Sequence, residues 1–145
     1  MPAGQYHIFA DQGSTFKLFL EYQTFGNTAI DLNSYNADMQ VRRNSSNDNL
    51  LLHFSGTTLA GAVTGGGLTG SYTGTGGVSG VGGITLNASS TGATGTTGGI
   101  FVLADATTMK NIPSGRHFYN LEVVNGTEVT RILEGRFEVD TEIVR

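Results

Sequence analysis

The glycine-rich stretch TGGGLTGSYTGTGGVSGVGG, residues 64–83, contains a pattern associated with phosphate binding. Gly65, Gly67 and Gly70 match G-x-G-x-x-G, in which a tight turn brings backbone amides close to the pyrophosphate of a dinucleotide. That chemistry also needs a strand before the turn, a helix after it and an acidic residue about 20 positions further on. Here SYTGTGG follows, which cannot form a helix, and the next acidic residue is Asp105. The match therefore reflects glycine content, and no nucleotide cofactor is predicted.

Metal or acid–base chemistry would need histidines and carboxylates at suitable spacings. The chain has three histidines, His7, His53 and His117. No second histidine stands two or four residues from any of them, and they are interpreted as edge or half-buried strand residues. Glu138, Asp140 and Glu142 share one face of an expected C-terminal strand, where they are interpreted as a solvated edge. There is no G-x-S-x-G elbow, so the sequence predicts no catalytic or metal-binding residue, and no enzyme.

Composition excludes several classes of partner. The net charge is −4, and Arg42 and Arg43 are the only adjacent basic residues, whereas a nucleic-acid interface gathers Lys and Arg on one face. No run of about 18 apolar residues occurs, and the N-terminal MPAGQYHIF lacks the basic start and apolar core of a signal peptide. The chain has no cysteine and hence no disulfide. We predict no nucleic-acid partner, no membrane insertion and no export by a signal peptide.

The charged residues are confined to the two ends of the chain. Between Phe54 and Ala104 there is no Asp, Glu, Lys or Arg, and residues 64–83 alone contain ten glycines. The flanks have the composition of ordinary globular protein. At 145 residues the chain fits one domain with one hydrophobic core.

The two flanks predict β-strands. Residues 14–22 place Phe16, Leu18, Leu20 and Tyr22 on one face, which is the period-two pattern of a half-buried strand. Further strands are expected at 6–10, 37–43, 50–54, 116–124 and 128–140, with a doubly buried strand at 99–104 and turns at 11–13, 25–28 and 44–49.

Two local signals refine the C-terminal flank. Asp105 can cap one short helical turn within residues 105–115, which Pro113 ends. Asn125 and the glycine after it are the strongest hairpin signal in the chain, and Gly135 predicts a bulge or a close backbone approach. The predicted fold is all-β: one antiparallel immunoglobulin-like sandwich over residues 1–145, with 56–98 inserted as a glycine-rich hairpin or arm.

Three stretches, in order and spacing, resemble a known family. They are QYHIFADQGSTFKLFLEYQ, AIDLNSYNADMQVR and IPSGRHFYNLEVVNGTEVTRILEGRFEVDTEIVR. They are similar to small immunoglobulin-like β-sandwich proteins of tailed bacteriophages, such as the adaptors of upper baseplates. The matching positions are Gln12, Gly13, Phe16, Ile30, Asp31, Leu32, Tyr35, Met39, Gln40, Arg42, Pro113, Gly115, Arg116, Tyr119, Leu121, Glu122, Val129, Thr130, Arg131, Glu134 and Gly135.

The resemblance covers residues 5–55 and 99–145 and none of the centre. It implies a virion structural protein, without catalytic residues, that joins copies of itself and other virion proteins in the tail, baseplate or fibre-attachment region. A host-receptor-binding adhesin and a capsid decoration protein are the alternatives. Virion localisation follows from the resemblance alone.

Two side-chain predictions accompany the matched motifs. Asp31 is expected to bond the backbone two residues further on and so to fix a turn, with Tyr35 packed over the end of the sandwich. Arg131 and Glu134 have opposite parity along one strand, so each is expected to pair across strands, for example with Glu122 or Arg116.

The glycine-rich stretch has three interpretations: a flexible linker, an arm that packs on a neighbouring subunit, and a receptor-binding tip. The arm is favoured, because linkers lack apolar side chains and an uncharged surface suits desolvation on assembly. A twisted hairpin is its expected form. The residues predicted to contact a partner are Leu59, Val63, Leu68, Tyr72, Val78 and Val81.

Overall fold

The computed structural model describes residues 4–23, 26, 28–43, 50–58, 70–74, 79–88 and 95–141. These residues are mostly β-strand, with one short helix. The strands are β1 (Gly4–Gln5), β2 (Ile8–Asp11), β3 (Phe16–Glu21), β4 (Asn36–Arg42), β5 (Leu50–Thr58), β6 (Gly70–Gly74), β7 (Ser79–Gly82), β8 (Ile84–Ala88), β9 (Gly95–Ala104), β10 (Gly115–Asn125) and β11 (Glu128–Asp140), and the helix is α1 (Ala106–Lys110).

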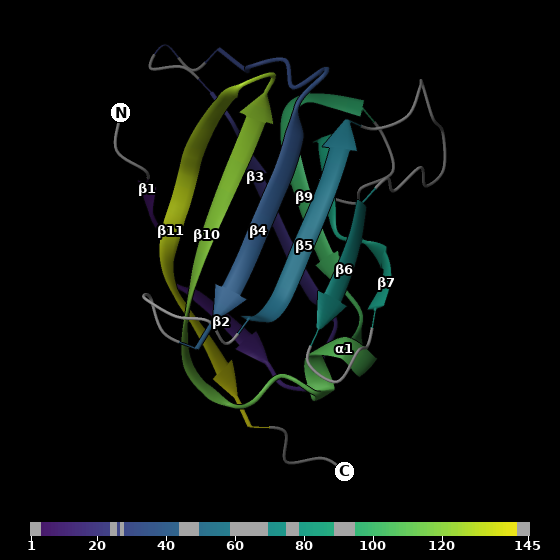
Figure 1. Ribbon diagram of the computed structural model, residues 1–145, viewed down its shortest axis with the longest axis vertical. Coiled ribbons are helices and arrows are strands. Elements are labelled where there is room, and N and C mark those ends of the chain that lie inside the picture. Colours follow the sequence, from purple (N-terminus) through teal and green to yellow (C-terminus); the bar gives the residue numbers. More distant parts are fainter. Residues whose placement is uncertain are drawn as a thin grey trace.

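The described strands form a single sheet that curls into a half-barrel. Its strand order is β1-β11-β10-β4-β5-β8-β9-β3, with β2 beside β11 and the β6–β7 pair beside β5. The curl carries β3 and β9 behind β10 and β4 (Figure 1). We refer to β11, β10, β4 and β5 as the front wall and to β8, β9 and β3 as the back wall. The all-β class is confirmed, but the sheet is mixed, because β1 and β2 run parallel to β11 and β5 runs parallel to β8.

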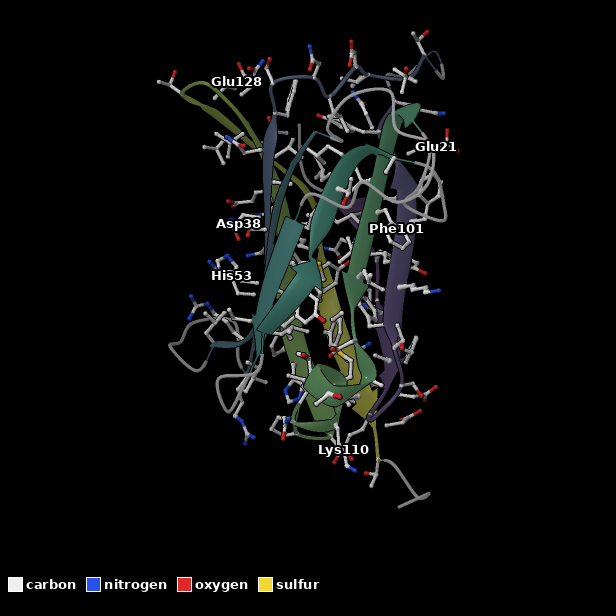
Figure 2. The ribbon with its side chains drawn as sticks, turned by 90° about the vertical axis from the view of Figure 1, so that its right-hand side faces the viewer. Glu21, Asp38, His53, Phe101, Lys110 and Glu128 are labelled. Atoms are coloured by element: carbon white, nitrogen blue, oxygen red, sulfur yellow. The ribbon has the colours of Figure 1, made fainter. Side chains whose placement is uncertain are left out.

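Strand β4 shows how the flanks form the front wall. Ala37, Met39 and Val41 are buried, while Asp38 and Gln40 are half-buried on the outer surface. This is the predicted alternation, and it arises because successive side chains of a strand point to opposite faces. Figure 2 shows the two walls edge-on, with Asp38 on the outer side of the front wall.

The predicted C-terminal hairpin is confirmed. Strands β10 and β11 pair antiparallel, with Asn125 opposite Glu128 and Gly126 at a φ of 62° in the turn between them. A β-bulge interrupts this pairing, because Leu121 pairs with Leu133 and the next pair is Glu122 with Arg131. Ile132 is therefore the extra residue, and the parity of β11 changes there.

Gly135 is a close-approach residue and not a bulge. It pairs regularly with Tyr119 in β10. A Cβ on Gly135 would lie 2.3 Å from the backbone oxygen of Tyr6. The second of the two predicted roles is therefore the one that the structure shows.

The helix and β9 also follow the sequence prediction. Asp105 caps α1 by accepting a hydrogen bond from the backbone N–H of Thr108 at 2.9 Å. The backbone N–H bond of Thr108 is the main cause that lowers the pKa of Asp105. Strand β9 lies between β8 and β3, and residues 98–102 are buried.

The core fills the half-barrel between the two walls. Aromatic rings at its centre pack in tilted contacts, with centroids 5.3 Å apart for Phe16 and Phe137 and 5.9 Å apart for Phe16 and Phe54. Buried apolar side chains from both walls surround them, including Met39, Leu52, Ile84, Leu86, Ile100 and Leu121, together with Leu32 from the segment before β4. Met109 and Ile112 close the core beside α1 and are fully buried.

The described part of the central stretch lies inside the sheet. Along one edge of β5, residues 52–55 pair with β6 and residues 56–58 pair with β8, so the sheet branches at Gly56. A Cβ on Gly56 would lie 1.4 Å from the backbone oxygen of Ile84, so only glycine, which has no Cβ, fits at this position. The prediction of an arm that leaves the sandwich therefore does not hold for residues 70–74 and 79–88, and the expected hairpin is the short β6–β7 pair.

Both faces of β8 are buried. Ile84 and Leu86 belong to the core, and the intervening Thr85, opposite Phe101 of β9, is also fully buried on the other face. The hairpin strands β6 and β7 lie against β8 and β9. Two-sided burial excludes unpaired charges, which accounts for the lack of charged residues in this part of the sequence.

Candidate functional site

Of the six predicted partner residues, four lie outside the described residues, and Val81 and Tyr72 lie in described strands. Leu59, Val63, Leu68 and Val78 lie outside the described residues. Val81 lies in β7, where its Cα pairs with Ser71 of β6.

Tyr72 is a core residue of this chain. Its side chain is 3 % exposed and packs against Phe54 with ring centroids 6.4 Å apart. Its hydroxyl accepts a hydrogen bond from the backbone N–H of Asp105 at 3.2 Å, and burial raises its pKa. Tyr72 is therefore corrected from a partner contact to a link between the central stretch and the helix.

The matched turn motif connects to the central stretch through Asn87. Asp31 accepts from the backbone N–H of Asn33 at 3.0 Å, as predicted, and also from the amide of Asn87 at 2.9 Å. The Asn87 bond is the main cause that lowers the pKa of Asp31. The side-chain oxygen Oδ1 of Asn87 accepts hydrogen bonds from the backbone N–H groups of Leu32 and Gly98, at 3.1 and 3.0 Å. Tyr35 packs against the core at this end.

The histidines do not meet in space. His7 Nδ1 accepts from the backbone N–H of Arg136 at 3.1 Å, and His117 is buried with its Nε2 2.7 Å from the Pro113 oxygen. His53 Nε2 lies 2.5 Å from Asp38 Oδ1 on the outer face of the front wall. Among the described residues no group of three or more His, Asp or Glu side chains is arranged to hold a metal ion.

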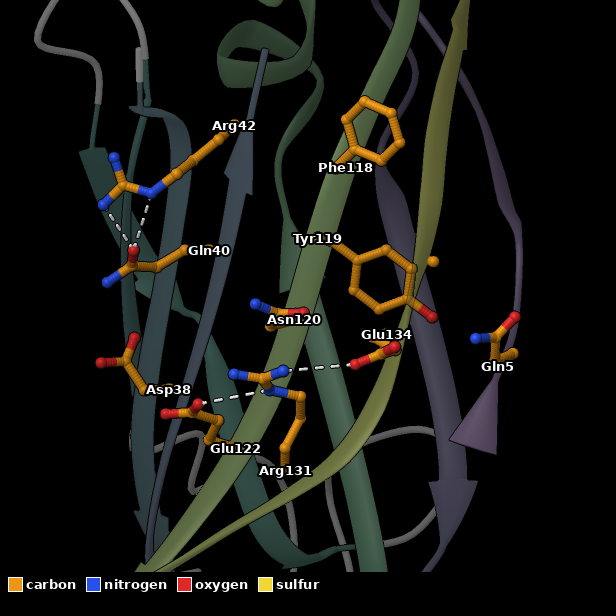
Figure 3. Close-up of a pocket in the computed structure, with 11 residues that line it drawn as sticks. Gln5, Asp38, Gln40, Arg42, Phe118, Tyr119, Asn120, Glu122, Arg131 and Glu134 are labelled. Carbon is orange, nitrogen blue, oxygen red and sulfur yellow. Dashed lines mark hydrogen bonds and ion pairs between the residues drawn. The ribbon is translucent and has the colours of Figure 1, made fainter. Parts of the chain in front are cut away.

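A polar groove of about 480 Å³ lies on the outer face of the front wall (Figure 3). It runs along β10 between β4 and β11, with one residue from β1. Amides, carboxylates, guanidinium groups and aromatic rings line it. They are Gln5, Asp38, Gln40, Arg42, Phe118, Tyr119, Asn120, Glu122, Arg131, Glu134 and Gly135.

Arg131 joins the two carboxylates at one end of this groove. Its Nε lies 3.6 Å from Glu122 Oε2, which is the cross-strand pair expected from the sequence. Its Nη1 lies 3.3 Å from Glu134 Oε1, although the parity of an unbroken strand forbids that contact. The bulge at Ile132 shifts the parity and places both side chains on one face. Arg116 pairs with Glu138 instead, at 3.0 Å.

The other end of the groove has a second set of bonded side chains. Gln40 Oε1 accepts two hydrogen bonds from Arg42, at 3.2 Å from Nε and 2.7 Å from Nη2. Between the two ends, Asn120 is exposed, and no hydrogen bond joins its side chain to another described residue. The ring of Phe118 is 37 % exposed beside Arg42 and Tyr119 (Figure 3).

A second hollow, of about 610 Å³, lies where the half-barrel stays open. We call it the seam. It runs between β3 on one side and β1 with β11 on the other. Half-buried apolar side chains that also pack against the core line it, namely Leu18, Leu20, Tyr22, Ile132 and Leu133.

The strands that border the seam have free edges. In the described part of the chain β3 pairs only with β9, and β1 and β2 pair only with β11. A third hollow of about 290 Å³ continues the opening between β2 and β3. Tyr6 and Phe9 on this side are 51 % and 72 % exposed.

The groove and the seam can do different chemistry. The groove offers hydrogen-bond donors and acceptors to a polar ligand, whereas the seam offers apolar surface and unpaired backbone groups to an extended chain. No described helix is long and apolar enough to cross a membrane.

No family model matches the sequence, and no curated protein matches it. The phage family that the flanks resemble therefore stays a prediction.

Sequence reasoning missed the groove and the seam. The individual groove residues are visible as the polar half of each alternating strand, but their grouping depends on the bulge and on strand order. The seam gives no signal in the sequence, because Leu18 and Leu20 have the same pattern whether their strand has one neighbour or two.

Proposed function

We propose that this chain is a non-enzymatic structural protein of a tailed-phage virion. It acts as an assembly or adaptor component of the tail, baseplate or fibre-attachment region, and its half-barrel is a variant of the immunoglobulin-like sandwich. Two of the motifs that suggest this family, around β4 and around the β10–β11 hairpin, form neighbouring strands of the front wall. Its partners are other virion proteins and copies of itself in a symmetric assembly.

The open seam is the observation that supports an assembly role. Monomeric proteins cover their edge strands or place charged side chains on them, because a free edge can pair with a strand of another chain. Among the described strands, β3 and β1 have free edges here, and they border apolar side chains that pack against the core. A neighbouring subunit that adds an extended strand would satisfy the backbone groups and cover these side chains at once.

The charged residues at the seam suit a partner that binds as an extended segment better than a partner that binds with a flat apolar surface. Glu21 on β3 and Arg131 on β11 are the charged side chains among the described residues that line it. Leu59, Val63, Leu68 and Val78 remain predicted contacts of the same assembly.

The decisive test is the position of the protein in purified virions. Quantitative mass spectrometry of intact particles should find it in every particle, and cryo-electron microscopy should place it in the tail as a threefold or sixfold multiple. Copies on the order of hundreds per particle would identify the capsid decoration protein instead. Absence from purified particles would overturn the proposal.

A matched pair of variants tests the seam itself. Tyr6→Glu places a charge beside the apolar surface, and Val129→Glu places the same charge on a residue of similar exposure, 58 %, at the far end of the β10–β11 hairpin. Both exposed sites should leave folding intact, as circular dichroism would show. Incorporation into particles should fall at least about tenfold for Tyr6→Glu only, a loss of about 1.4 kcal/mol. Equal incorporation of both variants would remove the seam from the interface.

The groove favours a host-binding adhesin as the second candidate function. It is a preformed polar surface on the outer face of the front wall, and most of its lining, apart from Gln5 and Arg131, does not border the seam. Particles that lack the protein should then assemble normally but adsorb poorly to the host, which an adsorption assay separates from a failure of assembly.

A further inference from the structure

We propose that the groove on the front wall binds a neutral oligosaccharide. The inference deepens the second candidate function, but it concerns a property of the isolated chain. It rests on the side chains that line the groove, on how they hold one another, and on their charge.

The lining suits hydroxyl groups, which donate and accept hydrogen bonds at the same oxygen. Amides supply both kinds of partner, carboxylates accept, and guanidinium groups donate. The groove brings all three kinds together in Asn120, Glu122 and Arg131, whose side chains lie next to one another in Figure 3. A surface that only keeps a sheet soluble needs charge but no hollow and no concentration of amides.

The lining is ordered before a ligand arrives. Arg131 is held by Glu122 and Glu134 at 3.6 and 3.3 Å, and Gln40 is held by two bonds from Arg42. Because the carbonyl oxygen of Gln40 accepts both bonds, its amide N–H groups are left to donate. Side chains that are already fixed lose less conformational entropy on binding.

The net charge of the groove argues for a neutral ligand. Asp38, Glu122 and Glu134 stand against Arg42 and Arg131, so the groove carries one net negative charge. The two guanidinium groups are already paired with acceptors. Phosphate groups and acidic peptides would find no excess positive charge, and basic peptides would find only a weak negative one.

The shape and the aromatic ring indicate more than one sugar unit. From Phe118 to Glu122 the groove follows four residue steps of β10, or about 13 Å. Phe118, 37 % exposed at one end, offers an apolar ring face against which the C–H face of a sugar can pack. An elongated saccharide chain can therefore contact the ring and Arg131 at the same time.

The test is nuclear magnetic resonance titration of the isotope-labelled full chain. The probes are neutral trisaccharides of glucose, galactose and N-acetylglucosamine, and the same sugars carrying sulfate. At least one neutral probe should shift the amide signals of Asn120 and Glu122 at millimolar concentration. The affinity should change less than about twofold when salt rises from about 0.05 to about 0.5 M, because the ligand carries no charge.

Three variants complete the experiment. Phe118→Ala and Asn120→Ala, both at exposed positions, should weaken binding at least about tenfold. Phe9→Ala removes an even more exposed ring outside the groove and should leave the affinity unchanged. The proposal is overturned if no neutral probe shifts the groove amides, if only sulfated sugars bind, or if an unstructured peptide library binds there in their place.

Discussion

Strands β4 and β8 belong to the same sheet but to different environments. In β4 the buried and half-buried residues alternate, with Met39 in the core and Gln40 on the outer surface. In β8 the alternation disappears, because Thr85 is as deeply buried as Ile84 and Leu86. The difference shows that residues 84–86 in the uncharged centre are buried within the chain itself. The chain's own β6–β7 pair lies against β8 and β9.

The sharpest test of this comparison puts the same charge on both outer faces. Thr85→Asp puts a carboxylate at a fully buried position and should cost more than about 4 kcal/mol of unfolding free energy. Gln40→Asp makes the same charge on the half-exposed face of β4 and should cost less than about 1 kcal/mol. Urea unfolding followed by circular dichroism measures both.

Thr85→Val is the control for this pair, because it keeps the shape without a charge and should cost about 1 kcal/mol. If the two Asp variants are equally stable, β8 is not covered on both faces, and the comparison fails.

The branch at Gly56 gives the next effect. In Gly56→Ala the new Cβ meets the backbone oxygen of Ile84, so β5 and β8 must separate, at a cost of about 3 kcal/mol. Gly4→Ala is the matched control, since its Cβ would meet the end of the Leu133 side chain at 3.3 Å and the backbone oxygen of Ile132 at an ordinary 3.5 Å, and it should cost less than about 1 kcal/mol. Thermal unfolding compares them, and a fully stable Gly56→Ala variant would rule out the close approach.

The bonds of Asn87 hold the centre to the matched turn. Asn87→Ala leaves the buried N–H of Leu32 and the N–H of Gly98 without their acceptor and should cost about 2 kcal/mol. Asn87→Gly, which keeps the positive φ of 56° accessible, separates the loss of these bonds from backbone strain. Chemical denaturation measures both variants.

The same substitution has a pH signature. Because Asn87 is the main cause that lowers the pKa of Asp31, that pKa should rise toward its ordinary value in Asn87→Ala. A lowered carboxylate pKa stabilises the fold above the unfolded value, and this contribution is lost as the pH falls through the folded pKa. The difference in unfolding free energy between the wild-type protein and Asn87→Ala should therefore narrow below about pH 4. An Asp31 carboxyl signal that titrates identically in the two proteins would show that Asn87 does not lower the pKa of Asp31.

Two buried tyrosines give the smallest effects and compare the centre with a flank. Tyr72→Phe removes the acceptor for the Asp105 N–H, and Tyr119→Phe removes a donor to the Tyr6 oxygen at 2.7 Å. Each should cost about 1 kcal/mol of unfolding free energy.

Tyr119 also predicts a pH dependence, because burial raises its pKa in the folded protein. The wild-type protein should therefore lose stability as the pH rises above about 10, and Tyr119→Phe should lose less stability over the same range. Calorimetry at neutral and alkaline pH measures both effects, and a Tyr72→Phe variant with unchanged stability would show that the centre is only loosely attached.

Local signals in the sequence were enough for most of the flanks. The alternation of residues 37–43, the cap at Asp105 and the hairpin at Asn125 each depend on neighbours within a few positions, and the structure confirms all three. The backbone bond of Asp31 is equally local. Such features are decided by side-chain period and by turn chemistry, which the sequence displays directly.

Tertiary structure alone decided the centre, the groove and the seam. The missing charges of the central stretch fit a surface covered by a partner as well as one covered by the chain itself, and only the pairing of β5 with both β6 and β8 distinguishes the two. The contact of Arg131 with Glu134 depends on one extra residue at Ile132, which reverses parity without any mark in the composition. Strand order and register are set by contacts between residues far apart in the chain, and the periodicity of a single strand carries no record of its neighbours.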